Sequence, residues 1–305
     1  MTEKTIESNI DHAHTYKQYQ QGLIFALIGA ALFSIKPVLV KLAYQAGGDA
    51  TSIMSLRAFS SLPLYLLMLV WSLRDSTNRQ HIRRYGWQAA AIGVLGYYVA
   101  SYLDISALES ISAQLERLLV FLFPTFVVLI TWYFQRQKPT KNTMWAILIG
   151  YLGIGFIVAH DVTYLGEKIW LGSSLAVGSA FIFACYLVLS KKVITIMGSQ
   201  LFTSIGMGSA GIAILIHLLA SEVNLSEMSS DLILIGVSLG IFCTVFPSYF
   251  IAAAMARLTP QQLSLTSNIG PAITAGFAVF LVNEPFTLYH VIGMTLVILS
   301  IFKLK

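Results

Sequence analysis

The sequence is poor in charged residues. Asp, Glu, Lys and Arg make up only 11% of its 305 residues, whereas soluble globular domains are about 25% charged. Hydrophobic residues make up 56%, and the mean hydropathy is +0.74. So few polar side chains cannot cover the surface of a water-soluble protein, which excludes a soluble catalytic domain. We expect an integral membrane protein.

Cysteines and ligand patterns are also scarce. Cys185 and Cys243 are the only cysteines, and both lie in apolar stretches, so we expect neither disulfides nor redox chemistry. His12 and His14 lie in a polar segment where we expect no metal, and we assign no role to His290. Because the chain also lacks a nucleophile motif and a phosphate-binding loop, we expect no metal, no cofactor and no enzymatic activity.

A signal-peptide pattern is absent as well. The first 20 residues, MTEKTIESNIDHAHTYKQYQ, are polar and lack the basic start, short apolar core and small-residue cleavage site of such a peptide. We therefore expect residues 1–21 to form a tail and the first apolar run to remain in the mature protein.

Long apolar runs fill the rest of the chain. A helix needs about 20 apolar residues to cross the hydrocarbon core, and continuous runs favour helices over an outer-membrane barrel. Short polar turns separate the runs, so little of the chain remains outside the bilayer. The sequence predicts ten spans, at residues 22–44, 51–73, 86–106, 112–134, 142–160, 169–190, 198–219, 231–256, 260–282 and 286–303.

The basic residues are distributed unevenly between the predicted loops. If the N-terminus is cytoplasmic, only Lys41 and Lys168 lie at outer ends, which agrees with the positive-inside rule. We expect both termini in the cytoplasm and a lipid bilayer as partner, without nucleic acid. The inner residues would be Lys4, Lys17, Arg74, Arg79, Arg83, Arg84, Arg136, Lys138, Lys141, Lys191, Lys192, Arg257, Lys303 and Lys305.

The two halves of the chain repeat one pattern. Sliding the sequence by about 150 residues places 22-GLIFALIGAALFSIKPVLVK-41 over 172-GSSLAVGSAFIFACYLVLSK-191, and a slide of about 147 places Pro124 over Pro271. Residues 22–160 and 169–303 would thus be two repeats of five spans. Because five is odd, the second repeat must enter the membrane from the opposite side. Such inverted repeats are typical of secondary transporters, although a rigid ten-helix scaffold would show the same pattern.

This arrangement resembles the drug/metabolite transporter superfamily, in particular its EamA-type family. The local marks are 55-SLRAF-59, 112-SAQLERLLVFLFPT-125 and 265-LTSNIGPAITAGFAVFLVNEP-285. A Glu, often with a Pro, follows the ninth span in that family, as Glu284 and Pro285 do here. The first half departs from this pattern, because 135-QRQKP-139 contains no Glu.

The resemblance implies a carrier of the bacterial inner membrane with a central cavity lined by spans 1, 3, 4, 6, 8 and 9. Such carriers move small metabolites, amino acids or drug-like compounds, usually outward. We expect a monomer or homodimer that exports small zwitterionic or anionic metabolites by alternating access, coupled to protons. The alternatives are an importer of a vitamin or nucleoside-like metabolite and an intramembrane enzyme that uses Asp104 and Glu116.

Five charged residues are the candidates for positions within the bilayer, where each charge costs at least a few kcal/mol. Helix rise places them in one layer toward the outer half; Lys36, for example, lies about 20 Å above the inner end of its span. They either form salt bridges between spans or line a substrate site. They are Lys36, Arg57, Asp104, Glu116 and Arg117, and their repeat mates are the uncharged Tyr186, Met207, Ile251, Leu263 and Ser264.

Several other residues complete the candidate site. We expect Tyr98, Tyr186 and Asn268 to bind substrate together with Lys36, Arg57, Glu116 and Arg117. Asp104 and Glu116 are the candidates for proton coupling. Proline removes a backbone donor, so we expect Pro37, Pro124 and Pro271 to kink their spans and act as hinges.

Overall fold

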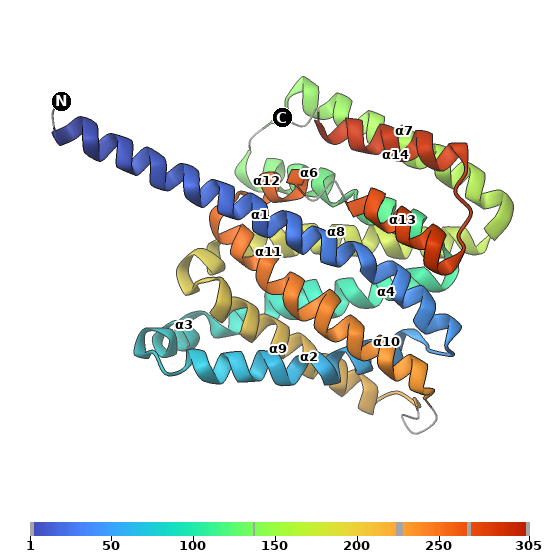
Figure 1. The fold of residues 1–305 in the computed structure, drawn as a ribbon, viewed down its shortest axis with the longest axis horizontal. Coiled ribbons are helices and arrows are strands. Elements are labelled where there is room, and N and C mark those ends of the chain that lie inside the picture. The colour runs from blue at the N-terminus through green and yellow to red at the C-terminus, as the bar shows by residue number, and fades with distance from the viewer. Residues whose placement is uncertain (1–2, 137, 224–227, 267–269, 303–305) are drawn as a thin grey trace.

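The computed structural model describes residues 3–136, 138–223, 228–266 and 270–302, and every regular element in them is a helix (Figure 1). The all-helical prediction is confirmed. In chain order the elements are α1 (Glu3–Gln45), α2 (Ala50–Ser72), α3 (Ser76–Gly93), η1 (Val94–Val99), α4 (Ala100–Ser110), α5 (Ala113–Val120), α6 (Phe123–Gln135), α7 (Lys141–Leu165), α8 (Lys168–Met197), α9 (Ser199–Leu219), α10 (Ser230–Gly240), η3 (Ile241–Val245), α11 (Phe246–Arg257), α12 (Pro260–Thr266), α13 (Gly270–Val282) and α14 (Leu288–Phe302).

Each predicted span coincides with one or more of these helices. Seven helical stretches of the described residues are long and apolar enough to cross a membrane, and shorter apolar helices occur at Ile147–Val158 and Gly270–Val282. The protein is thus a multi-pass membrane protein, while the count of ten spans stays a prediction. The seven are Lys17–Gln45, Ala50–Ser72, Ser76–Ser110, Ala113–Phe134, Lys168–Met197, Ser199–Leu219 and Ser230–Arg257.

The polar N-terminal segment is helical too. α1 begins at Glu3 and continues without a break into the apolar part of the chain, so the predicted tail is an extension of the first span. In Figure 1 this end of α1 projects beyond the helix bundle.

Two predicted spans contain a turn of π-helix. The stretch 76–110 runs through η1, and the stretch 230–257 runs through η3. A shift of about 147 residues relates these two turns, which is the shift that relates the halves of the sequence. π-turns widen a helix locally and often occur at functional sites. No feature of the sequence predicted them.

Span 4 contains a helix start where a kink was expected. α5 ends at Val120 and α6 begins at Phe123, so Pro124 lies in the first turn of a new helix. Pro271 lies in α13, next to residues outside the described part of the chain, so the expectation for it stays a prediction. Proline fits at the position of Pro124 because the first turn of a helix has N–H groups without intrahelical partners. The expectation of a kink is corrected for Pro124, whereas Pro37 does lie inside continuous helix α1.

Helices of the first half pack mainly on helices of the second half. The most extensive pairs are α1 with α11, α2 with α9, α4 with α8, and α7 with α14. The α7–α14 pair lies side by side along one edge of the bundle (Figure 1).

Glycines bring α10 close to α2, the helix that carries Arg57. A Cβ atom on Gly236 would collide with the Leu56 side chain, and one on Gly240 would lie 2.7 Å from the Arg57 carbonyl oxygen. Gly236 and Gly240 therefore serve close packing within one chain, as GxxxG motifs do in membranes.

Replacing Gly240 with Ala should destabilise the protein by about 1–3 kcal/mol, because the added methyl group pushes α10 away from α2. Gly276 is the matched control, since a Cβ atom there meets no atom within 4 Å. Gly276→Ala should leave the thermal unfolding midpoint in detergent unchanged or slightly raised. Equal midpoints for the two variants would show that the α2–α10 approach is not tight.

Candidate functional site

A cavity of about 90 Å³ lies at the centre of the bundle, and all five predicted intramembrane charges line it. Room of this size holds several water molecules. Lys36 comes from α1, Arg57 from α2, Asp104 from α4, and Glu116 and Arg117 from α5. The structure thus brings together five charges that the sequence scatters over four predicted spans.

Lys36 and Asp104 form a salt bridge across the cavity wall. Lys36 Nζ lies 2.5 Å from Asp104 Oδ2, and both side chains are largely buried. Pro37, which also lines the cavity, has no N–H to donate to the Phe33 carbonyl. The ion pair links α1 to α4 at the point where the α1 hydrogen-bond ladder is interrupted.

The two arginines contact neutral groups. Arg57 is buried and donates from Nη2 to the Tyr97 carbonyl oxygen at 3.4 Å. Arg117 donates from Nη2 to Ser34 Oγ at 3.2 Å and lies over the Phe121 ring, while its Nε has no hydrogen-bond partner in the described residues. Neither guanidinium forms a salt bridge within the described ranges.

Glu116 is buried beside Asp104. Its Oε2 has no hydrogen-bond partner in the described part of the chain, and its carboxyl group is an immediate neighbour of the Asp104 carboxyl group. Because Lys36 is paired with Asp104, the cavity keeps two guanidinium groups that form no salt bridge in the described part of the chain, against one further carboxyl group.

The second half of the chain gives the cavity an uncharged wall. Ile251 and Leu263, the repeat mates of Asp104 and Glu116, line it. The other second-half residues on the cavity are Ser179, Phe183, Leu187, Cys243 and Thr244. All the charged residues on the cavity therefore come from the first half, and the second half adds mostly apolar side chains.

The two tyrosines predicted to bind substrate, Tyr98 and Tyr186, have different surroundings. Tyr98 is not on the cavity, because its hydroxyl group contacts His217 Nδ1 of α9 at 3.1 Å. Its neighbour Tyr97 lines the cavity, and the Tyr97 ring meets the edge of the buried Tyr186 ring at 5.1 Å. Asn268 lies outside the described residues.

Thr244 and Ser179 line the cavity but were not predicted from the sequence, whereas Tyr97 was one of the tyrosines considered for a substrate contact. Tyr97 lies in η1 and Thr244 in η3, and Thr244 Oγ1 donates to the Leu239 carbonyl oxygen at 2.9 Å. Ser179 Oγ donates to the Ala100 carbonyl oxygen at 2.8 Å and joins α8 to α4. The sequence carries one signal for this contact, because small residues recur every four positions beside Ser179, at Gly172, Ala176 and Ala180 in span 6.

Glu284 caps the helix that carries Glu116 and Arg117. Its carboxylate accepts from the Ala113 N–H at 2.6 Å and from the Gln114 N–H at 3.2 Å. These N–H groups belong to the first turn of α5, where donors have no intrahelical partner and the helix dipole favours negative charge. A residue of the second half thus fixes a helix of the first half.

Lys191 makes the complementary contact in the other half. Its ammonium group donates to the carbonyl oxygens of Met255 and Leu258, at the C-terminal end of α11. Cations suit this end of a helix because its carbonyl groups are unsatisfied.

The comparisons with known proteins agree with this architecture. The model of the EamA-like transporter family matches residues 20–159 and again residues 170–304. A Bacillus subtilis (strain 168) protein named Uncharacterized transporter YcbK is 26% identical over 280 residues, which are 89% of this chain and 88% of that protein. A Clostridium kluyveri protein named Uncharacterized transporter is 22% identical over 287 residues, 92% of both chains.

One solved crystal structure superposes with a TM-score of 0.67 at 17% identity and covers 93% of this chain and 97% of that one, which is a likeness of fold. The family model covers nearly the whole sequence in two successive matches. This multi-pass membrane protein belongs to the EamA-like transporter family.

Proposed function

We propose that the protein is a secondary transporter of the bacterial inner membrane that exports small anionic or zwitterionic metabolites, such as amino acids, by alternating access. The observation that carries the proposal is the charge of the central cavity. Its Lys36–Asp104 pair is neutral overall, while Arg57 and Arg117 have no carboxylate partner among the described residues.

The unpaired guanidinium groups set the sign of the substrate. A guanidinium binds a carboxylate through two parallel hydrogen bonds, and burial strengthens the attraction. The apolar wall of Phe183, Leu187 and Ile251 suits the uncharged part of a small metabolite.

The neighbouring carboxyl groups of Asp104 and Glu116 support proton coupling. Two carboxyl groups that share a site cannot both ionise without a large repulsion, so one of them holds a proton. Asp104 already faces Lys36, which leaves Glu116 as the group that gains and loses the proton. A substrate carboxylate bound at Arg117 would change the charge beside Glu116 and thus link the two events.

The packing of the helices supports ten spans in two inverted repeats, residues 22–160 and 169–303. In an inverted repeat, span 6 corresponds to span 1 and span 8 corresponds to span 3. A contact between spans 1 and 8 should therefore have a counterpart between spans 6 and 3. The pairs α1–α11 and α8–α4 have this relation. Pro37, Pro124 and Pro271 are the proposed hinges between the inward-facing and outward-facing shapes.

The inner and outer ends of the site have separate contacts. With both termini in the cytoplasm, as the basic loops favour, the Glu284 cap lies toward the outer side and the Lys191 contacts toward the inner side. Opening to one side would require the contacts of that side to separate.

The proposal predicts that Arg57→Gln lowers transport about tenfold or more, because a hydrogen bond to a charged group contributes about 1.5–3 kcal/mol. The measurement is the exchange of radiolabelled amino acids across proteoliposomes that hold the purified protein. Tyr98→Phe is the matched control, since Tyr98 is not on the cavity, and it should retain wild-type rates. Undiminished exchange by Arg57→Gln, or a preference for cationic solutes, would contradict the proposed substrate class.

A further inference from the structure

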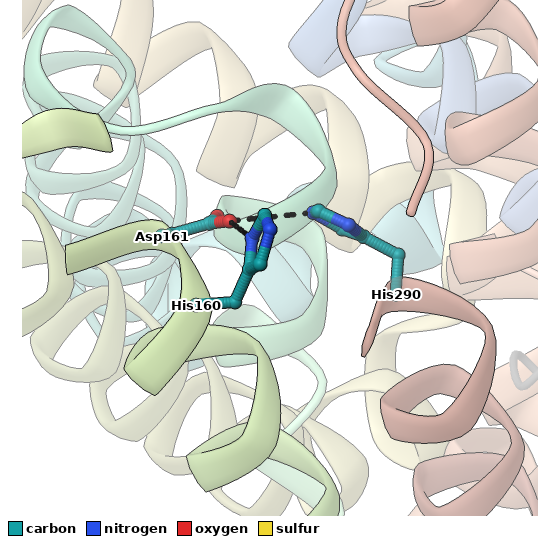
Figure 2. A group of neighbouring side chains, drawn as sticks. All are labelled: His160, Asp161 and His290. Atoms are coloured by element: carbon teal, nitrogen blue, oxygen red, sulfur yellow. Dashed lines mark hydrogen bonds and ion pairs between the residues drawn. The ribbon is translucent and has the colours of Figure 1, made fainter. Parts of the chain in front are cut away.

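A second cluster of polar side chains joins α7 to α14. His160 and Asp161 lie near the C-terminal end of α7, and His290 lies in the first turn of α14 (Figure 2). None of the three lines the central cavity. Gly293 brings the two helices together, because a Cβ atom there would meet Ile157 and the Gly153 carbonyl oxygen at less than 3 Å. The close approach places His290 opposite Asp161.

The distances between the polar atoms suit a metal ion. His160 Nδ1 lies 3.1 Å and His290 Nε2 lies 3.5 Å from Asp161 Oδ1, and the three ligand atoms lie within 4.8 Å of one another. In a tetrahedral zinc site with bonds of about 2.0–2.1 Å, neighbouring ligand atoms are about 3.3 Å apart. Two of the three separations already have this value to within a few tenths of an ångström.

The second carboxylate oxygen of Asp161, Oδ2, is independent evidence that a bound cation belongs at this cluster. Asp161 is 6% exposed, and its Oδ2 has no hydrogen-bond partner in the part of the chain that the structure describes. A buried, unsatisfied carboxylate oxygen is costly, and bound cations are a usual compensation.

The surrounding groups hold the imidazole rings in place. Thr287 Oγ1 lies 2.9 Å from His290 Nδ1, which turns the opposite nitrogen, Nε2, toward Asp161. The His160 ring stacks on the Tyr289 ring at 4.8 Å. Metal-binding histidines are commonly fixed by a hydrogen bond at the nitrogen that does not bind the metal.

We propose that His160, Asp161 and His290 bind a divalent transition-metal ion of the zinc type between α7 and α14. Two imidazole nitrogens and one carboxylate oxygen suit Zn²⁺, whereas Mg²⁺ and Ca²⁺ prefer oxygen ligands throughout. The fourth position is left for water. The ion would tie one helix of the first half to one of the second half. This proposal replaces the expectation from sequence that the chain holds no metal.

The test uses the full-length protein, purified in detergent through a tag without histidine and stripped with a chelator. Cobalt(II) is the probe, because its visible absorption reports tetrahedral coordination. We expect one cobalt ion per chain, tetrahedral absorption, displacement by Zn²⁺ and a higher thermal unfolding midpoint with metal.

Matched variants assign the site. Asp161→Asn and His290→Gln should each weaken cobalt binding about tenfold or more, and Thr287→Val should weaken it about tenfold through the loss of a supporting hydrogen bond. His217→Gln should bind as the wild type does, since His217 contacts Tyr98 in another part of the bundle. If one of the three site variants, Asp161→Asn, His290→Gln or Thr287→Val, fails to fold, cobalt binding by the other two still tests the assignment of the ligands.

Two results would overturn the proposal. One is the absence of tetrahedral cobalt absorption in the wild-type protein. The other is undiminished binding by Asp161→Asn and His290→Gln, which would place the metal elsewhere.

Discussion

Lys36→Met should destabilise the protein by about 3–5 kcal/mol, because it leaves the buried Asp104 carboxylate without its partner. The double variant Lys36→Met/Asp104→Asn should recover most of this loss, since it removes both charges. The measurement is the thermal unfolding midpoint in detergent, compared with Lys192→Met, which removes an exposed lysine of α8 and should change little.

Transport by the same double variant separates the two interpretations of the charged layer. If the Lys36–Asp104 pair only joins α1 to α4, the double variant should regain transport together with stability. Our proposal predicts that stability returns while transport stays at least about tenfold below wild type, because the cavity has lost a group that shapes substrate and proton binding. Recovery of both would assign the pair a purely structural role.

Glu284→Gln should lower the free energy of unfolding by about 1–3 kcal/mol, since the charged acceptor of two N–H groups at the start of α5 becomes neutral. The effect should appear as a lower thermal unfolding midpoint. Transport should fall as well, because the cap positions the helix that carries Glu116 and Arg117.

Glu167 provides the matched control for this prediction. It stands at the N-cap of α8, but its side chain makes no capping hydrogen bond. Glu167→Gln should therefore leave the unfolding midpoint near that of the wild type. Equal shifts for the two variants would mean that the Glu284 hydrogen bonds add nothing beyond the general attraction between an acid and a helix N-terminus.

Much of the fold could be predicted because the bilayer restricts what an apolar run can do. A run of about 20 apolar residues must satisfy its backbone internally, so each predicted span coincides with helix. The interruptions could not be predicted in the same way. Whether Pro124 kinks a helix or begins one depends on how the turn at Phe121 and Leu122 packs, and the π-turns η1 and η3 leave no mark in composition.

Depth in the membrane could be predicted for the charged residues, but not their direction around the helix axis. Helix rise placed Lys36, Arg57 and Asp104 in one layer, and the structure gathers them around one cavity. Tyr97 and Tyr98 differ by about 100° around the axis, and nothing in the sequence says which faces inward. Three bases and two acids also allow several pairings, of which the structure shows Lys36 with Asp104.

The cluster of His160, Asp161 and His290 lay beyond sequence reasoning for a related reason. Its ligands come from two helices at the ends of the two halves, and no short motif spacing connects them. Only the packing of α7 on α14 reveals the site.

The central claim is that a positively charged cavity opens in turn to both sides of the membrane, and Cys243 allows a direct test. This thiol lines the cavity, and Cys185→Ala would leave it as the only cysteine. Its reaction with anionic and cationic membrane-impermeant thiosulfonates would be timed in right-side-out and inside-out vesicles, relative to a free thiol. We predict reaction from both sides, faster with the anionic reagent, and loss of that preference in Arg57→Gln. Reaction from one side only, or a preference for the cationic reagent, would contradict the account.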